Sequence, residues 1–124
     1  MKYIIICLIL FSQFIFPHDK DESRAHIFKD ELRVNDQVFN AITEIDKFYR
    51  TKYQKINAEI SFRRSELNEV IYTKPYNQQK AKLILQEIAN AQTDMRLHAI
   101  QHHFEIEKKL DSFQKMKFNE IFNP

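Results

Sequence analysis

The chain has 124 residues, with 19 Lys and Arg against 17 Asp and Glu, and it contains no glycine, three prolines and one cysteine. This length suits one small domain, and a mixed, nearly balanced charge gives no reason to expect nucleic acid or an anionic membrane surface as a partner. Without glycine the chain has few places to turn tightly, so long helices are expected between the prolines.

The first 17 residues, MKYIIICLILFSQFIFP, have a basic start followed by an apolar run. This layout is typical of a signal peptide, and the run is short for a membrane span, which needs about 20 apolar residues. No small-x-small cleavage site is visible near Phe16, and no lipobox surrounds Cys7. Residues 1–17 are therefore either a cleaved signal peptide or a retained N-terminal anchor, and both predict a periplasmic domain at 18–124 that has no cysteine.

The first two predicted helices differ in length. Residues 18–33 should form a short polar helix, with Ile27, Phe28 and Leu32 as its apolar contacts. Asn35 has the residue type of an N-cap and should open a long second helix. The apolar residues of that helix recur mostly in steps of three and four, with a gap at Arg63, which predicts an amphipathic, coiled-coil-like seam. They are Val38, Ile42, Ile45, Tyr49, Tyr53, Ile56, Ile60, Leu67 and Ile71.

Pro75 interrupts this pattern within TKPYN, residues 73–77, and a third helix should begin near Gln78. Its apolar stripe comprises Ala81, Ile84, Ile88, Ala91, Met95, Ala99, His102, Ile106 and Leu110. The last helix should start at Asp111, where D-S-F-Q is a variant of the capping box. With no strand signal, the prediction is an all-α fold: a four-helix hooked hairpin in which two long antiparallel helices lie between short first and last helices.

Several large apolar residues fall outside the predicted seam, namely Phe39, Phe48, Phe62, Leu97, Ile100 and Phe104. Such residues need a second layer, a partner chain or a ligand to cover them. A homodimer is the simplest prediction. The alternative interpretation is a surface that binds unfolded protein clients.

Asp46 and His102 lie at nearly equal distances from the turn at 73–77, so a folded-back hairpin would place them at equal height. His98 lies four residues before His102 and shares its helix face. A carboxylate beside imidazoles suits a transition metal, with zinc, nickel and copper as the candidates. Each residue also has a structural interpretation: His102 as a seam histidine bonded to Asp46, Asp46 as a partner of Arg50, and His98 as a partner of Asp94.

Three further residues have side chains that could bind a transition metal. His26 is a candidate ligand on the first helix. His103 should face outward near Glu107, and Met95 is most simply a core residue, although a thioether could serve copper(I). The sequence contains no H-E-x-x-H motif and no recognisable Ser/His/Asp arrangement, so an enzyme is not expected.

The arrangement resembles the periplasmic heavy-metal-resistance and stress proteins, which include the Spy and CpxP chaperones and the CnrX-like metal sensors. Leu110-Asp111-Ser112-Phe113-Gln114 resembles their L-T-x-x-Q motif, and Val34-Asn35-Asp36-Gln37-Val38 resembles a more degenerate copy. The sensors carry H-x-F-x-M-x-x-x-L on the third helix, which here matches the run from His102 to Leu110. The resemblance implies that His102 and Asp46 hold a metal.

The chain departs from this pattern at three positions. The Met ligand of the sensors falls on Ile106, which cannot bind a metal, and their first-helix H-x-x-x-H pair falls on Ala25 and Lys29, with His26 one residue away. The expected function is periplasmic heavy-metal resistance or metal and stress sensing, beside a membrane-bound regulatory partner if residues 1–17 are retained. The alternatives are a Spy-like chaperone and a structural hairpin without either activity.

Overall fold

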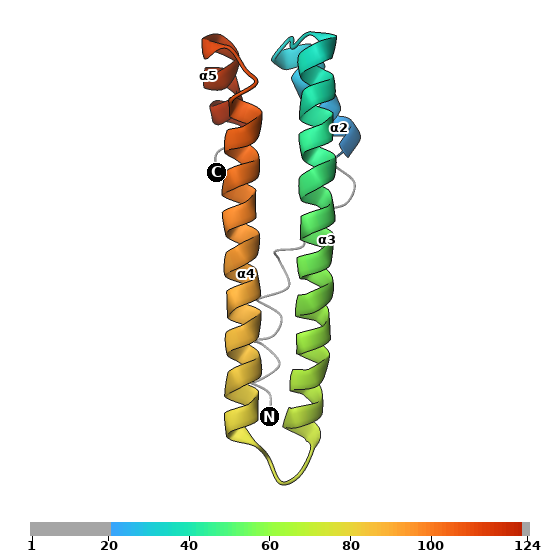
Figure 1. Cartoon of the computed structure of the whole chain (residues 1–124), viewed down its shortest axis with the longest axis vertical. Coiled ribbons are helices and arrows are strands. Elements are labelled where there is room, and N and C mark those ends of the chain that lie inside the picture. Colours follow the sequence, from blue (N-terminus) through green and yellow to red (C-terminus); the bar gives the residue numbers. More distant parts are fainter. Residues whose placement is uncertain (1–20, 123–124) are drawn as a thin grey trace. The chain divides into compact units, whose positions relative to one another are not determined.

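The computed structural model describes residues 21–122, and helices cover most of this part of the chain (Figure 1). In chain order they are α2 (Asp21–His26), the π-helix η3 (Ile27–Glu31), α3 (Asp36–Tyr72), α4 (Gln78–Glu107) and α5 (Ser112–Ile121). Residues 21–122 contain no strand, so the predicted all-α class is confirmed for them. The predicted leader, residues 1–17, lies outside the described residues.

The chain divides into two compact units, Met1–Arg33 and Val34–Pro124. In the first unit the predicted helix changes from α to π geometry at Ile27, and the N–H of Leu32 donates to the carbonyl oxygen of Ile27 at 3.0 Å. Phe28 and Leu32 are buried, as expected. Arg33 follows with a φ of 51°, a left-handed conformation that usually falls to glycine. A chain without glycine makes this turn with arginine.

The three helices of the second unit begin at side-chain caps. Asn35 Oδ1 accepts from the N–H of Val38 at 2.9 Å, and Asn77 Oδ1 accepts from the N–H of Lys80 at 3.0 Å. At α5, Asp111 Oδ1 accepts from the N–H of Gln114 while Gln114 Oε1 accepts from the N–H of Asp111. Each cap satisfies backbone N–H groups that the first turn leaves free. The predicted caps at Asn35 and Asp111 are confirmed.

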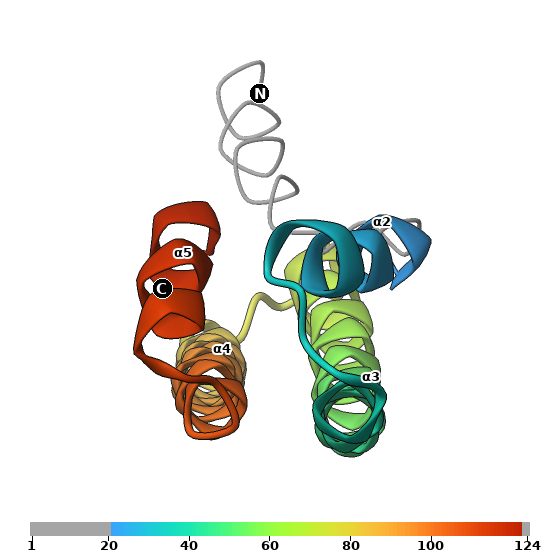
Figure 2. The same cartoon turned by 90° about the horizontal axis from the view of Figure 1, so that it is seen from above.

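Helices α3 and α4 pack side by side along most of their length (Figures 1 and 2). Arg63 pairs with Glu87 near the middle, and Asp46 pairs with His102 farther from the connecting loop. Residue numbers therefore fall along α3 as they rise along α4, so the two helices run in opposite directions. Their apolar core is formed by Ile60, Val70, Ala81, Ile84, Ile88 and Ala91, with Ile56, Leu67 and Met95 packed against it.

The contact seam of α3 repeats every seven residues. Ile42, Tyr49, Ile56, Arg63 and Val70 form one series, and Asp46, Tyr53, Ile60 and Leu67 lie between them. This period corrects one prediction: Val70 is 8 % exposed and belongs to the core, whereas Ile71, which was expected in the seam, is 46 % exposed. A seam that follows a supercoil keeps the seven-residue period, and Ile71 lies one residue past it.

The gap in the apolar pattern at Arg63 holds an ion-pair cluster. The Arg63 guanidinium lies 2.8 Å from Glu66 Oε2 and 3.3 Å from Glu87 Oε2. Arg63 therefore links α3 to α4 in the middle of the seam. The hydrogen bond that Arg63 donates to Glu66 is the largest of the effects that raise the pKa of Arg63. Within residues 21–122, no helix is both long and apolar enough to span a membrane.

Candidate functional site

Part of the seam between α3 and α4 is polar. It lies between the apolar core and the buried residues Ile42 and Ile106, which are nearer the end farthest from the connecting loop. Here α3 contributes Asp46, Tyr49 and Tyr53, and α4 contributes His98, His102 and Glu105. Both sets are spaced by three and four residues, so each forms one face of its helix. We call these six residues the polar layer.

His102 is at the centre of the polar layer and is only 7 % exposed. Its Nε2 lies 2.6 Å from Asp46 Oδ1, and its Nδ1 lies 3.1 Å from the Tyr53 hydroxyl. A carboxylate only accepts hydrogen bonds, so in the neutral imidazole Nε2–H donates to Asp46 and Nδ1 accepts from Tyr53. Asp46 and His102 are thus paired, as predicted. The contact is a hydrogen bond, which matches the interpretation of His102 as a seam histidine bonded to Asp46.

Tyr49 packs against one face of the His102 imidazole and holds that ring in place. The two rings stack with centroids 4.6 Å apart and an interplanar angle of 12°. The Tyr49 hydroxyl donates to Glu105 Oε1 at 3.2 Å. Burial, followed by this hydrogen bond, raises the pKa of Tyr49 above its usual value. Glu105 was not predicted as part of the site, although its seven-residue offset from His98 places it on the same face.

The other two predicted ligands have partners of their own. His98 is half-buried, and its Nδ1 lies 3.2 Å from Gln101 Oε1, so its partner is Gln101 and not the expected Asp94. The His98 ring lies 6.4 Å from that of Tyr49. His26 belongs to the first unit and is exposed, with Nδ1 3.3 Å from Asp30 Oδ2 one turn later.

The number and position of the donor atoms around His102 differ from those of a typical zinc site. Asp46 lies at one ring nitrogen and Tyr53 at the other, so the two oxygen atoms approach opposite edges of the imidazole. One ion at Nε2 would thus gain two protein donors, fewer than the three or four of typical zinc sites. Among residues 21–122, no three His, Cys, Asp or Glu side chains are grouped as a metal site. As arranged, the pair fits a buried hydrogen bond better than a complete metal site.

His103 corrects another prediction, because it faces inward. Its ring stacks on Phe118 of α5 with centroids 4.5 Å apart, and its Nε2 lies 2.8 Å from Asn119 Oδ1. Glu107 Oε2, the expected neighbour, lies 3.7 Å from the same nitrogen. α5 packs against the end of α4 (Figure 2). It covers the face of α4 that carries His103, which would face solvent if only α3 and α4 were present.

A second feature of this unit is apolar surface on the sides of the helices away from the seam. On α4, Leu97, Ile100 and Phe104 are spaced i, i+3, i+7 and are 53 %, 45 % and 51 % exposed. We call these three residues the outer stripe. On α3, Phe48 and Phe62 are also exposed, as predicted. Lys52 Nζ lies 4.6 Å from the ring centre of Phe48, so a cation covers part of this aromatic surface.

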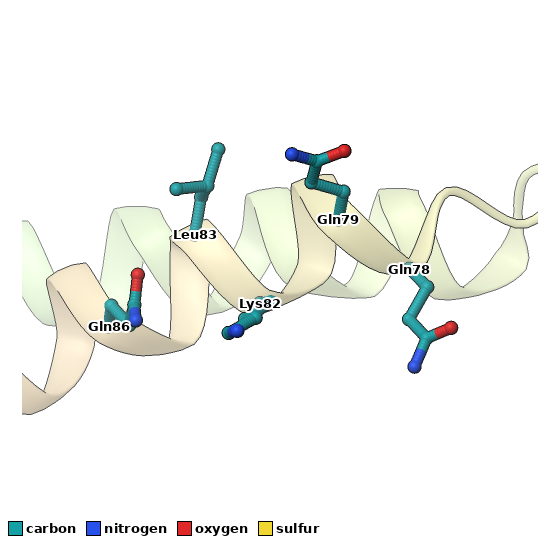
Figure 3. Close-up of a pocket in the computed structure, with 5 residues that line it drawn as sticks. All are labelled: Gln78, Gln79, Lys82, Leu83 and Gln86. Atoms are coloured by element: carbon teal, nitrogen blue, oxygen red, sulfur yellow. The ribbon is translucent and has the colours of Figure 1, made fainter.

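A shallow hollow near the start of α4 offers no comparable site. It is lined by Gln78, Gln79, Lys82, Leu83 and Gln86, which all come from one helix. Their side chains point to different sides of that helix (Figure 3), so they do not converge on a common ligand position.

Comparison with known proteins gives no match to a family, to a curated protein or to a solved structure.

Proposed function

We propose that this chain is an exported stress protein of the Spy and CpxP type, which holds unfolded protein clients on the apolar outer faces of a helical hairpin. The observation that supports this most directly is the outer stripe. It places three large apolar side chains, each about half exposed, on the face of α4 opposite its buried seam. Soluble proteins rarely expose contiguous apolar surface unless another molecule covers it.

The chemistry around the exposed aromatic rings also suits varied polypeptide clients. Lys52 lies over Phe48, and Lys117 Nζ lies 5.2 Å from the ring centre of Phe113. Mobile cationic side chains beside exposed rings keep such a surface soluble while leaving apolar area for a client. Binding of this kind tolerates different sequences because it uses surface area more than a fixed set of hydrogen bonds.

Suppression of client aggregation tests this proposal. The full chain should delay the light scattering of a denatured enzyme, and Leu97→Gln/Ile100→Gln/Phe104→Gln should lose most of the effect. The matched control is Ile71→Gln/Tyr72→Gln/Tyr76→Gln, which removes three exposed apolar side chains near the connecting loop. Circular dichroism should show unchanged helix content in both variants. Equal loss in both would contradict a role specific to the outer stripe.

A homodimer belongs to the same proposal, because a second copy could cover the outer stripe when no client is bound. Sedimentation of the full chain at micromolar concentration should show a dimer, and the outer-stripe triple variant should sediment as a monomer. A wild-type protein that is monomeric and also fails to suppress aggregation would leave a structural hairpin as the better description.

Metal sensing is the second candidate, because Asp46 and His102 place a carboxylate and an imidazole side by side in the seam. A transition metal could replace the proton between these atoms, with His98 or solvent supplying further donors. If residues 1–17 remain attached, they would hold the sensor beside a membrane-bound regulatory partner. No nucleic acid and no catalytic activity are part of either candidate.

Calorimetric titration with zinc, nickel and copper separates this candidate from the first. His102→Gln should abolish most of the binding and Asp46→Asn should weaken it, while aggregation suppression should be unaffected. Wild-type affinity in His102→Gln would mean that His102 is a structural histidine. Binding should also weaken as pH falls, because protons compete with the metal for imidazole.

A further inference from the structure

His103 differs from its neighbour His102 in how oxygen atoms approach its ring. Two of them, Asn119 Oδ1 from α5 and Glu107 Oε2 from α4, lie near the same nitrogen, Nε2, at 2.8 Å and 3.7 Å. At His102 the two oxygen atoms instead lie at opposite nitrogens. At His103 an amide oxygen and a carboxylate oxygen thus lie near one nitrogen of the ring.

We propose that His103, Glu107 and Asn119 form a binding site for a divalent transition metal, which joins α5 to the end of α4. This site is separate from the Asp46–His102 pair and does not depend on client binding. Imidazole nitrogen with carboxylate and carbonyl oxygen is a donor set that zinc, nickel and manganese accept. Water would complete the coordination, because the protein supplies three donors.

The separations of the two oxygen atoms from His103 Nε2 are compatible with one ion. With metal–nitrogen and metal–oxygen bonds of about 2.0–2.2 Å, neighbouring ligand atoms are about 2.9 Å apart in octahedral and about 3.4 Å apart in tetrahedral geometry. The observed separations from Nε2 are 2.8 Å and 3.7 Å. Each is within a few tenths of an ångström of this range, so small side-chain rotations would complete the site.

The packing around His103 holds its ring in place for this role. The ring is 9 % exposed and stacks on Phe118, which is fully buried, so the direction of Nε2 is fixed. Glu107 follows one turn later on α4, the i,i+4 spacing at which two side chains of a helix reach one ion. Asn119 is exposed and the Glu107 side chain is 25 % exposed, so a metal could enter from solvent beside a buried imidazole.

Binding at this position would add a cross-link between α4 and α5, which already pack through the stacking of His103 on Phe118. Asn119 lies near the end of α5, whereas His103 and Glu107 lie near the end of α4. A ligand that binds only when all three side chains are assembled stabilises the state in which α5 packs on α4 over the state in which α5 has separated from it. The metal should therefore protect α5 from local opening more than it protects α3.

Zinc titration of the full chain, followed by calorimetry, tests the site. We expect about one zinc per chain, with affinity roughly tenfold lower in Glu107→Gln and roughly tenfold higher in Asn119→Asp, which adds a charged donor. Hydrogen exchange of the amides of residues 112–121 should slow when zinc is added. Both substitutions are at solvent-accessible side chains, so neither requires the core to repack.

His102→Gln distinguishes the two candidate positions of the metal. Zinc bound at His103 should keep its affinity within about threefold in this variant, whereas zinc bound at the Asp46–His102 pair should lose most of its affinity. Three results would overturn the proposal. They are an absence of zinc binding, an unchanged affinity in both Glu107→Gln and Asn119→Asp, or a loss of binding in His102→Gln that Glu107→Gln does not reproduce. The last of these would assign the metal to the Asp46–His102 pair.

Discussion

Asp46 Oδ1 lies 2.6 Å from His102 Nε2, although 56 residues separate the two in the chain. The contact joins α3 to α4 in a seam that also contains the apolar core and the Arg63 ion pairs. A buried imidazole that loses its partner keeps a polar N–H without a hydrogen bond, which costs more than the bond itself contributes.

Replacing Asp46 should destabilise the fold through His102. We expect Asp46→Ala to lower the free energy of unfolding by about 1–3 kcal/mol, because it leaves the N–H of a buried ring unpaired. Urea unfolding of the two single variants and of Asp46→Ala/His102→Ala would give the coupling energy. His98→Gln is the control, since its half-exposed ring should change stability by about 0.5 kcal/mol or less. Additive single effects would mean that the contact contributes little.

The core position at the loop end of α3 can be tested with adjacent residues. Val70→Ala should lower the free energy of unfolding by about 1–3 kcal/mol, because it removes two buried methyl groups. Ile71→Ala removes more carbon from an exposed position and should cost about 0.5 kcal/mol or less. The opposite ranking in thermal or chemical unfolding would mean that Ile71, and not Val70, faces α4 in solution.

The capping box of α5 should control how firmly that helix is formed. Asp111→Ala should cost about 0.5–2 kcal/mol, since it removes the acceptor for the N–H of Gln114. Amide hydrogen exchange over residues 112–121 would detect the loss even if global unfolding changes little. Ser112→Ala, one residue later, should leave exchange nearly unchanged. Equal protection in Asp111→Ala would show that packing of Phe118 alone holds α5.

Alkaline pH should destabilise the fold through Tyr49, whose pKa is raised by burial and by Glu105. Between the ordinary tyrosine pKa of about 10 and this higher value, the unfolded chain loses its proton while the folded chain keeps it. The contribution of Tyr49 to stability is therefore complete below about pH 10. It is lost progressively as the pH rises from there through the higher pKa of the folded chain. Thermal midpoints measured from pH 8 to 11 should fall less in Tyr49→Phe than in the wild type. Parallel curves would contradict this.

Much of the helix layout could be predicted from local sequence. The caps at Asn35 and Asp111 and the start of α4 at Gln78 are found where the sequence indicates them, because capping depends on side chains within one turn. The pairing of Asp46 with His102 was also predictable, since two helices that pack in opposite directions pair residues at equal distances from their connection.

Tertiary packing decided the details that give the site its chemistry. Val70 and Ile71 have similar local signals, and only the seven-residue period of two helices wound together selects Val70. His103 is buried because α5 packs Phe118 against it, a contact that the helical periodicity of α4 cannot contain. Likewise, the oxygen atoms of Asp46, Tyr53 and Asn119 that approach the His102 and His103 rings come from residues 16 to 56 positions away. These distances are fixed only when the helices pack.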